Sequence, residues 1–128
     1  MKLTKRLGIY MDHTTAHVMD ITSGEFQSSK VESAFSNRDK EEMIHEGESR
    51  LHHAEQKIDK AYYKKIGDII RNYDEVVLFG PSKAKDELHN VLSADHLFAK
   101  IDIQVKHSDK LTENQQHAFV RDYFRTKL

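Results

Sequence analysis

The sequence contains no cysteine and no tryptophan, and it has a single proline, Pro81. The absence of cysteine excludes disulfide bonds, thiolate metal sites and cysteine nucleophiles. Apolar runs are short, and none approaches the roughly 20 residues that a transmembrane helix needs. The basic residues 1–6 lead into an alternating pattern rather than the continuous apolar core of a signal peptide. We therefore expect a cytoplasmic protein without membrane association.

Neither sign of charge is in excess. Lysine and arginine total 20 and aspartate and glutamate total 21, so the formal net charge is −1. This balance gives no global reason to expect nucleic-acid binding and leaves only a local basic patch open. The 128 residues are 38% hydrophobic and 32% charged, which is typical of one soluble domain spanning residues 1–128.

The order of the apolar segments predicts the fold class. Three short strand-like runs come first, at Leu7–Met11, Ala16–Ile21 and Phe26–Phe35. A long helical stretch then spans Asn37–Tyr73, and strands at Val76–Phe79 and Ile101–Val105 each lead into a helix. We interpret this order, βββαβαβα, as an α/β domain with a ribonuclease H-like mixed five-stranded sheet and one long projecting helix.

Asp12, at the end of the first predicted strand, has three interpretations. Ribonuclease H-type nucleases use an acidic residue here to hold two divalent metals. Such a site would add helix carboxylates such as Glu46 or Glu48, but Gly80-Pro81 stands where a second strand-end acid is expected. Actin- and Hsp70-like ATPases place paired threonines after the aspartate, yet His13 replaces their glycine and the chain is too short for two lobes. The pattern favours a turn aspartate.

The first half of the long helical stretch carries a seam of alternating large and small residues. Large side chains recur every seven residues at Ile44, Leu51 and Ile58, and Gly47, Ala54 and Ala61 follow each by three. Such a seam suits close pairing of two helices, so we predict self-association through Ile44, Gly47, Leu51, Ala54 and Ile58. The second half, with Tyr62, Ile66, Ile69, Ile70 and Tyr73, predicts packing on the sheet.

Acidic residues and histidines share another stripe of the same segment. They are Glu41, His45, Glu48, His52 and Glu55. Carboxylate-bridged metal sites need ligands from several helices. No second cluster is evident in the sequence, so solvated Glu–His pairs are the favoured interpretation, and we predict no metal site.

The connection after Val76–Phe79 is the strongest candidate for a binding site. The strand is wholly apolar, as expected of a central strand covered on both faces. A loop that joins the carboxyl end of such a strand to a helix is a common anion site in open α/β sheets. Ser82 is the predicted N-cap, and Lys83 and Lys85 would add positive charge for a phosphate. The alternative is a capped turn with exposed lysines.

The last strand and helix carry local signals of their own. Ile101–Val105 alternates as a strand with one polar face, and Thr112 with Gln115 has the spacing of a capping box. The apolar face of the final helix is predicted to comprise Ala118, Phe119, Tyr123 and Phe124.

The loops before these last two helices carry a family resemblance. Gly80-Pro81, Ala84-Lys85 and Glu87-Leu88, together with the run from Asp109 to Gln115, resemble a group of small bacterial proteins. That group is similar to the middle domain of archaeal and eukaryotic peptide-chain release factors and of Pelota. The resemblance covers most of the chain and implies a ribonuclease H-like fold with ribosome-linked roles such as rescue, termination or hibernation.

The chain departs from that family at the catalytic loop. Release factors act through Gly-Gly-Gln, and this tripeptide does not occur here. The resemblance therefore supplies no catalytic residue, and we expect a non-enzymatic protein without a cofactor.

Three functions remain open from the sequence. The first is a translation- or ribosome-associated factor that contacts RNA or a ribosomal partner through basic residues. These are Lys83, Lys85, Lys106 and Lys110, with Arg121 and Arg125 as further candidates. The second is a dimeric stress-response or interaction adaptor that pairs through Ile44–Ala61. The third is a metal-dependent nuclease that uses Asp12.

Overall fold

Five strands form one mixed sheet in the computed structural model, which describes residues 4–22, 27–33 and 60–126. The strands are β1 (Arg6–Met11), β2 (Thr15–Asp20), β3 (Gln27–Glu32), β4 (Glu75–Gly80) and β5 (Asp102–His107). Their order in the sheet is β3-β2-β1-β4-β5. The β1–β2 and β2–β3 pairs are antiparallel, whereas β4 runs parallel to β1 and to β5. The predicted mixed five-stranded sheet is confirmed.

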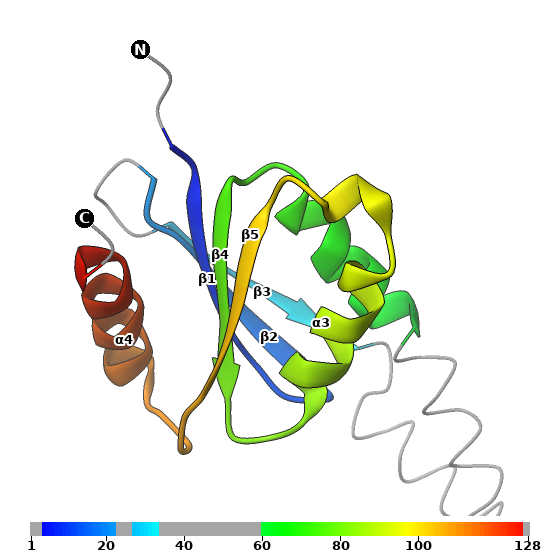
Figure 1. Ribbon diagram of the computed structural model, residues 1–128. Coiled ribbons are helices and arrows are strands. Elements are labelled where there is room, and N and C mark those ends of the chain that lie inside the picture. The colour runs from blue at the N-terminus through cyan, green and yellow to red at the C-terminus, as the bar shows by residue number, and fades with distance from the viewer. Residues whose placement is uncertain (1–3, 23–26, 34–59, 127–128) are drawn as a thin grey trace, which may run out of the picture.

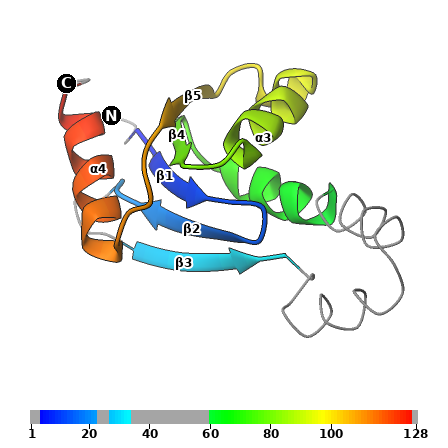
Figure 2. The ribbon, with the colours of Figure 1, turned by 90° about the horizontal axis from the view of Figure 1, so that it is seen from below.

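Helices cover both faces of this sheet (Figure 1, Figure 2). One face carries the helix at residues 60–70, α3 (Ala84–Ser93) and the short 3₁₀ helix η1 (His96–Phe98). The other face carries α4 (Glu113–Thr126). The sequence pattern did not predict η1, which begins where the Asp95 carboxylate accepts a hydrogen bond of 3.0 Å from Leu97 N. None of the described helices has the length and apolar character to span a membrane.

Successive side chains of the two central strands, β1 and β4, point to opposite faces of the sheet and join two separate clusters of the core. Leu7, Ile9 and Met11 of β1 and Val76 and Leu78 of β4 join the cluster under the 60–70 helix and α3. Tyr10 of β1 and Val77 and Phe79 of β4 join the cluster under α4. All four apolar residues of the predicted central strand, Val76–Phe79, are at most 1% exposed. This burial confirms that β4 is covered on both faces.

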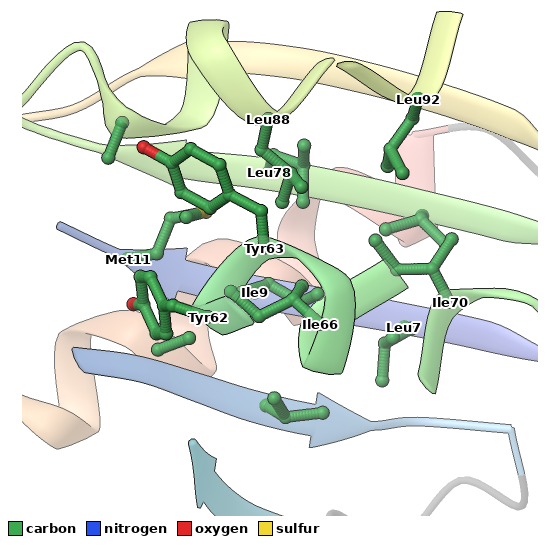
Figure 3. Close-up of a cluster of buried hydrophobic side chains, with 14 of the residues drawn as sticks. Leu7, Ile9, Met11, Tyr62, Tyr63, Ile66, Ile70, Leu78, Leu88 and Leu92 are labelled. Atoms are coloured by element: carbon green, nitrogen blue, oxygen red, sulfur yellow. The ribbon is translucent and has the colours of Figure 1, made fainter. Parts of the chain in front are cut away.

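The 60–70 helix forms part of the first cluster (Figure 3). Tyr62, Ile66 and Ile70 are at most 1% exposed, and they pack with Leu88 and Leu92 of α3. The predicted packing of this part of the long helix on the sheet is therefore confirmed. Its projecting part lies outside the described residues, as do the predicted self-association seam (Ile44, Gly47, Leu51, Ala54, Ile58) and the stripe of Glu41, His45, Glu48, His52 and Glu55.

The predicted apolar face of α4 was wrong at one residue, Ala118. Ala118 is exposed, whereas Val120, which the prediction did not include, is 0% exposed and lies over β1. The backbone of Gly8 allows this approach, because a Cβ there would collide with the Val120 side chain. Phe119 stacks on Phe79 with ring centroids 4.2 Å apart, and Phe124 is buried as predicted.

The start of α4 has the predicted capping box. Gln115 N donates to Thr112 Oγ1 over 3.3 Å, and Thr112 N donates to Gln115 Oε1 over 2.9 Å. The reciprocal bonds satisfy two amides that the first turn of a helix leaves free. They also fix the direction in which α4 leaves the loop after β5.

Candidate functional site

The carboxyl ends of the three parallel strands meet at one edge of the sheet. In the strand register Tyr10 lies opposite Phe79, and Gly80 lies opposite His107. Ser108 N donates to the Gly80 carbonyl over 3.2 Å, which joins the loop after β5 to the end of β4. The loops after β1, β4 and β5 therefore lie side by side, and we call residues 12–14, 81–83 and 106–110 the carboxyl edge. Ligand sites of open α/β sheets form at this place.

The loop after β4 begins with a glycine that no other residue can easily replace. Gly80 has φ of 147°, and a Cβ there would collide with the Met11 carbonyl oxygen. The turn then passes through Pro81 and Ser82. Ser82 is not the N-cap that the sequence predicted, because α3 begins at Ala84 and Lys83 occupies the cap position. Ser82 therefore lies one position before the N-cap. Its hydroxyl still accepts a hydrogen bond of 3.3 Å from Ala84 N.

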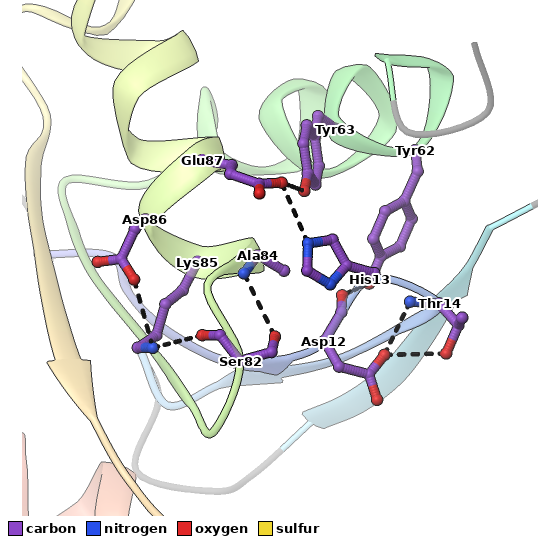
Figure 4. Close-up of polar contacts among 10 residues, drawn as sticks. All are labelled: Asp12, His13, Thr14, Tyr62, Tyr63, Ser82, Ala84, Lys85, Asp86 and Glu87. Atoms are coloured by element: carbon purple, nitrogen blue, oxygen red, sulfur yellow. Dashed lines mark hydrogen bonds and ion pairs between the residues drawn. The ribbon is translucent and has the colours of Figure 1, made fainter. Parts of the chain in front are cut away.

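Lys85 differs from the prediction of an exposed lysine (Figure 4). Its side chain is 4% exposed, and Nζ donates to the Ser82 carbonyl and lies 3.5 Å from the Asp86 carboxylate. The side chain turns back from the first turn of α3, where the loop carbonyl of Ser82 accepts a hydrogen bond from its ammonium group. The ammonium of Lys85 therefore stabilises the loop and does not point to solvent.

The other predicted lysines are placed at the surface. Lys83, Lys106 and Lys110 are exposed at the carboxyl edge, and no described acidic side chain forms an ion pair with them. The structure thus brings three of the four predicted lysines to one edge of the sheet. Arg121 and Arg125 lie farther along α4, which runs from this edge toward the opposite one (Figure 1).

Asp12 closes the turn between β1 and β2 (Figure 4). Its Oδ1 accepts bonds of 2.8 Å from Thr14 N, 2.9 Å from Thr14 Oγ1 and 2.8 Å from Thr15 N. Partial burial raises the pKa of this carboxyl, but the three hydrogen bonds and the charge of His13 outweigh it, so the pKa lies below its usual value. Asp12 has the turn role that the sequence favoured.

Sequence reasoning missed a polar contact that joins three elements at this edge. Glu87 Oε1 accepts a hydrogen bond of 2.7 Å from Tyr63 OH and lies 3.1 Å from His13 Nε2. Tyr62, next in the chain to Tyr63, donates to the Asp12 carbonyl over 3.0 Å. The residues are far apart in the sequence, so no motif spacing could have indicated them. Together they tie the loop after β1 to the 60–70 helix and α3.

A metal site receives no support from this edge. In the parts of the chain that the structure describes, no three histidine, aspartate or glutamate side chains gather closely enough to hold a metal ion. Glu46 and Glu48, the partners considered for Asp12, lie outside those parts.

Comparison with known proteins identifies the fold through structure alone. No protein-family model matches the sequence, and no curated protein matches it. Among solved structures, Pelota of Thermoplasma acidophilum is similar over 93% of this chain, with a TM-score of 0.59 and 14% identity. Pelota of Archaeoglobus fulgidus is similar over 94% (TM-score 0.60, 6% identity), and the archaeal translation termination factor aRF1 over 95% (TM-score 0.53, 11% identity).

The chain spans only part of these proteins. It covers 32% of each Pelota chain and 39% of the termination factor. The likeness confirms the family resemblance carried by the loops before the last two helices. The chain has the fold of a domain found in Pelota and in archaeal release factors.

Proposed function

We propose that this chain is a non-enzymatic, translation-associated factor that contacts ribosomal RNA through the carboxyl edge, in a role such as ribosome rescue or hibernation. The observation that carries the proposal is the likeness, over 95% of the chain, to a protein that acts in translation termination. Two Pelota structures are similar over 93% and 94% of the chain.

Exposed lysines supply the proposed contact. Lys83 lies in the loop after β4, Lys106 near the end of β5 and Lys110 in the loop after β5, so three exposed lysines lie at one edge of the sheet. RNA phosphates release condensed counterions when lysines neutralise them, which makes such binding steeply dependent on salt. Because the whole chain carries a net charge of −1, contact with RNA depends on a local cluster of basic residues such as this one.

Two features support a role without catalysis. The sequence lacks the Gly-Gly-Gln loop through which release factors act. The Asp12 carboxylate, which a nuclease would use, accepts three hydrogen bonds within its own turn. The dimeric adaptor and the metal-dependent nuclease remain predictions, because their other residues lie outside the described parts of the chain.

Sedimentation of the tagged protein in host lysate tests the proposal. We expect the protein to comigrate with ribosomes at low salt and to be released at high salt. Charge reversal by Lys83→Glu with Lys106→Glu should shift the protein to the top of the gradient even at low salt. Each lost phosphate contact lowers the salt slope by about one unit.

A matched variant controls for net charge. Lys65 and Lys100 are exposed lysines outside the carboxyl edge, so Lys65→Glu with Lys100→Glu makes the same change in net charge elsewhere. This variant should still comigrate with ribosomes. Comigration that salt does not affect, or equal loss in both variants, would contradict a phosphate contact at this edge. Absence of the unmodified protein from the ribosome fractions would contradict the proposal as a whole.

A further inference from the structure

A concave surface lies on the face of the sheet opposite α4. It is a groove of about 500 Å³ between the 60–70 helix, α3 and η1. Gly67, Leu92 and Phe98 are buried residues that line it. The helix approaches these side chains closely at Gly67, where a Cβ would lie 3.3 Å from Leu92 Cδ2 and 3.4 Å from Phe98 Cζ. The floor of the groove is therefore made of closely packed side chains.

The rim of the groove exposes apolar side chains. Val91 is 55% exposed and Leu97 is 51% exposed, and these are the large hydrophobic side chains that the described residues leave in solvent. Both line the groove. Single exposed apolar residues are common on protein surfaces, but two of them beside an apolar depression are typical of an interaction site.

The opposite rim is basic. Lys60, Lys64 and Arg71 line the groove from one stripe of the helix and the turn after it. Among the described residues no acidic side chain forms an ion pair with any of the three. The lining also contains two acids: Asp68, which is exposed on the same stripe four residues after Lys64, and Asp95, which accepts the hydrogen bond that begins η1. The groove thus combines an apolar floor with a helix rim on which three basic side chains outnumber one acid, Asp68.

We propose that this groove binds an acidic amphipathic helix of a partner protein. Helices that dock in grooves insert apolar side chains at positions i, i+3 or i+4, and i+7. Here those side chains would contact Val91, Leu92, Leu97 and Phe98, while carboxylates on the flank of the helix would pair with Lys60, Lys64 and Arg71. A basic helix would meet like charges along the same rim, so the charge pattern selects the acidic partner.

A pair of synthetic peptides tests this proposal with the full chain. One peptide carries leucines at the docking positions and glutamates on the flank, and the other has lysines in place of the glutamates. Calorimetry and amide chemical shifts should show binding of the glutamate peptide only, with shifts at Lys64, Gly67, Val91 and Leu97. Added salt should weaken this binding, because the rim charges are exposed.

Matched substitutions locate the site. Val91→Lys and Leu97→Lys should each weaken binding of the glutamate peptide about tenfold, because each removes an apolar contact and places a charge against the leucines of the peptide. Asn90→Lys adds the same charge beside Val91, outside the groove lining, and should have little effect. Lys64→Glu should likewise weaken binding more than Lys65→Glu does.

Three outcomes would overturn the proposal. The first is equal binding of the two peptides, and the second is equal loss in the groove and control variants. The third is no binding by the full chain, which is also the result expected if another segment of the same chain fills the groove.

Discussion

At and beside the carboxyl edge, residues of the same type have different roles. Lys83 and Lys85 are two positions apart, yet one is exposed and the other donates to the Ser82 carbonyl from a buried site. The sequence predicted the same role for both, because the spacing of two lysines does not show which loop carbonyl lies within reach. The same limit applies to Glu87, whose partners Tyr63 and His13 come from distant parts of the chain.

Removal of the Lys85 ammonium should destabilise the fold. Lys85→Met keeps most of the aliphatic side chain and leaves the Ser82 carbonyl without its donor, so the free energy of unfolding should fall by about 1–3 kcal/mol. Urea denaturation followed by circular dichroism measures the change. Lys83→Met is the control, and it should change stability by at most about 0.5 kcal/mol. An equal effect of the two substitutions would show that the buried contact does not stabilise the loop.

At the scale of elements, local patterns in the sequence predicted most of what the structure shows. Alternation of apolar residues, and for β4 a wholly apolar run, located the strands to within a few residues, and the capping box located the start of α4. The short helix η1 was missed although Asp95 caps it locally, and the groove was missed because it depends on contacts of the 60–70 helix with α3 and η1. The apolar face of α4 was partly wrong, since helical spacing does not reveal that Gly8 makes room for Val120.

The contact between α4 and β1 can be tested with a pair of substitutions. Gly8→Ala places a methyl group where the Val120 side chain lies, and such overpacking should cost about 1–3 kcal/mol of unfolding free energy. Adding Val120→Ala frees that space. The double variant should therefore be less destabilised than the sum of the two single variants, as measured by urea denaturation. Strict additivity would mean that the two positions do not share the contact.

At the scale of the whole molecule, carboxylates link the turns of the sheet to its helices. Asp20 accepts hydrogen bonds of 2.8 Å from Thr22 N and 2.7 Å from Tyr73 OH, and so connects β2 to the chain after the 60–70 helix. Burial raises its pKa, but these bonds and the charge of Lys5 outweigh that effect and lower it. The Asp12 pKa is lowered by bonds of the same kind.

The lowered pKa values predict the direction of acid sensitivity. An aspartate with a folded-state pKa below its unfolded value, about 3.9, stabilises the protein above that value. This stabilisation is lost as the pH falls through the folded-state pKa. Unfolding free energies measured from neutral pH down to acid should therefore decrease, and Asp12→Asn with Asp20→Asn should flatten the decrease. Asp109→Asn, at an exposed loop position, is the control and should leave the slope unchanged.

The pairing of β1 with β4 has a consequence for synthesis on the ribosome. β1 occupies the middle of the sheet, but its parallel partner follows 69 residues later, as the Arg6–Glu75 contact shows. At about 5–20 residues per second, the ribosome takes roughly 3–14 s to make that intervening stretch. During this interval one edge of β1 has no partner, and Leu7, Ile9 and Met11 have no helix above them. The nascent chain therefore presents an apolar strand edge that invites pairing with other chains until β4 has been made.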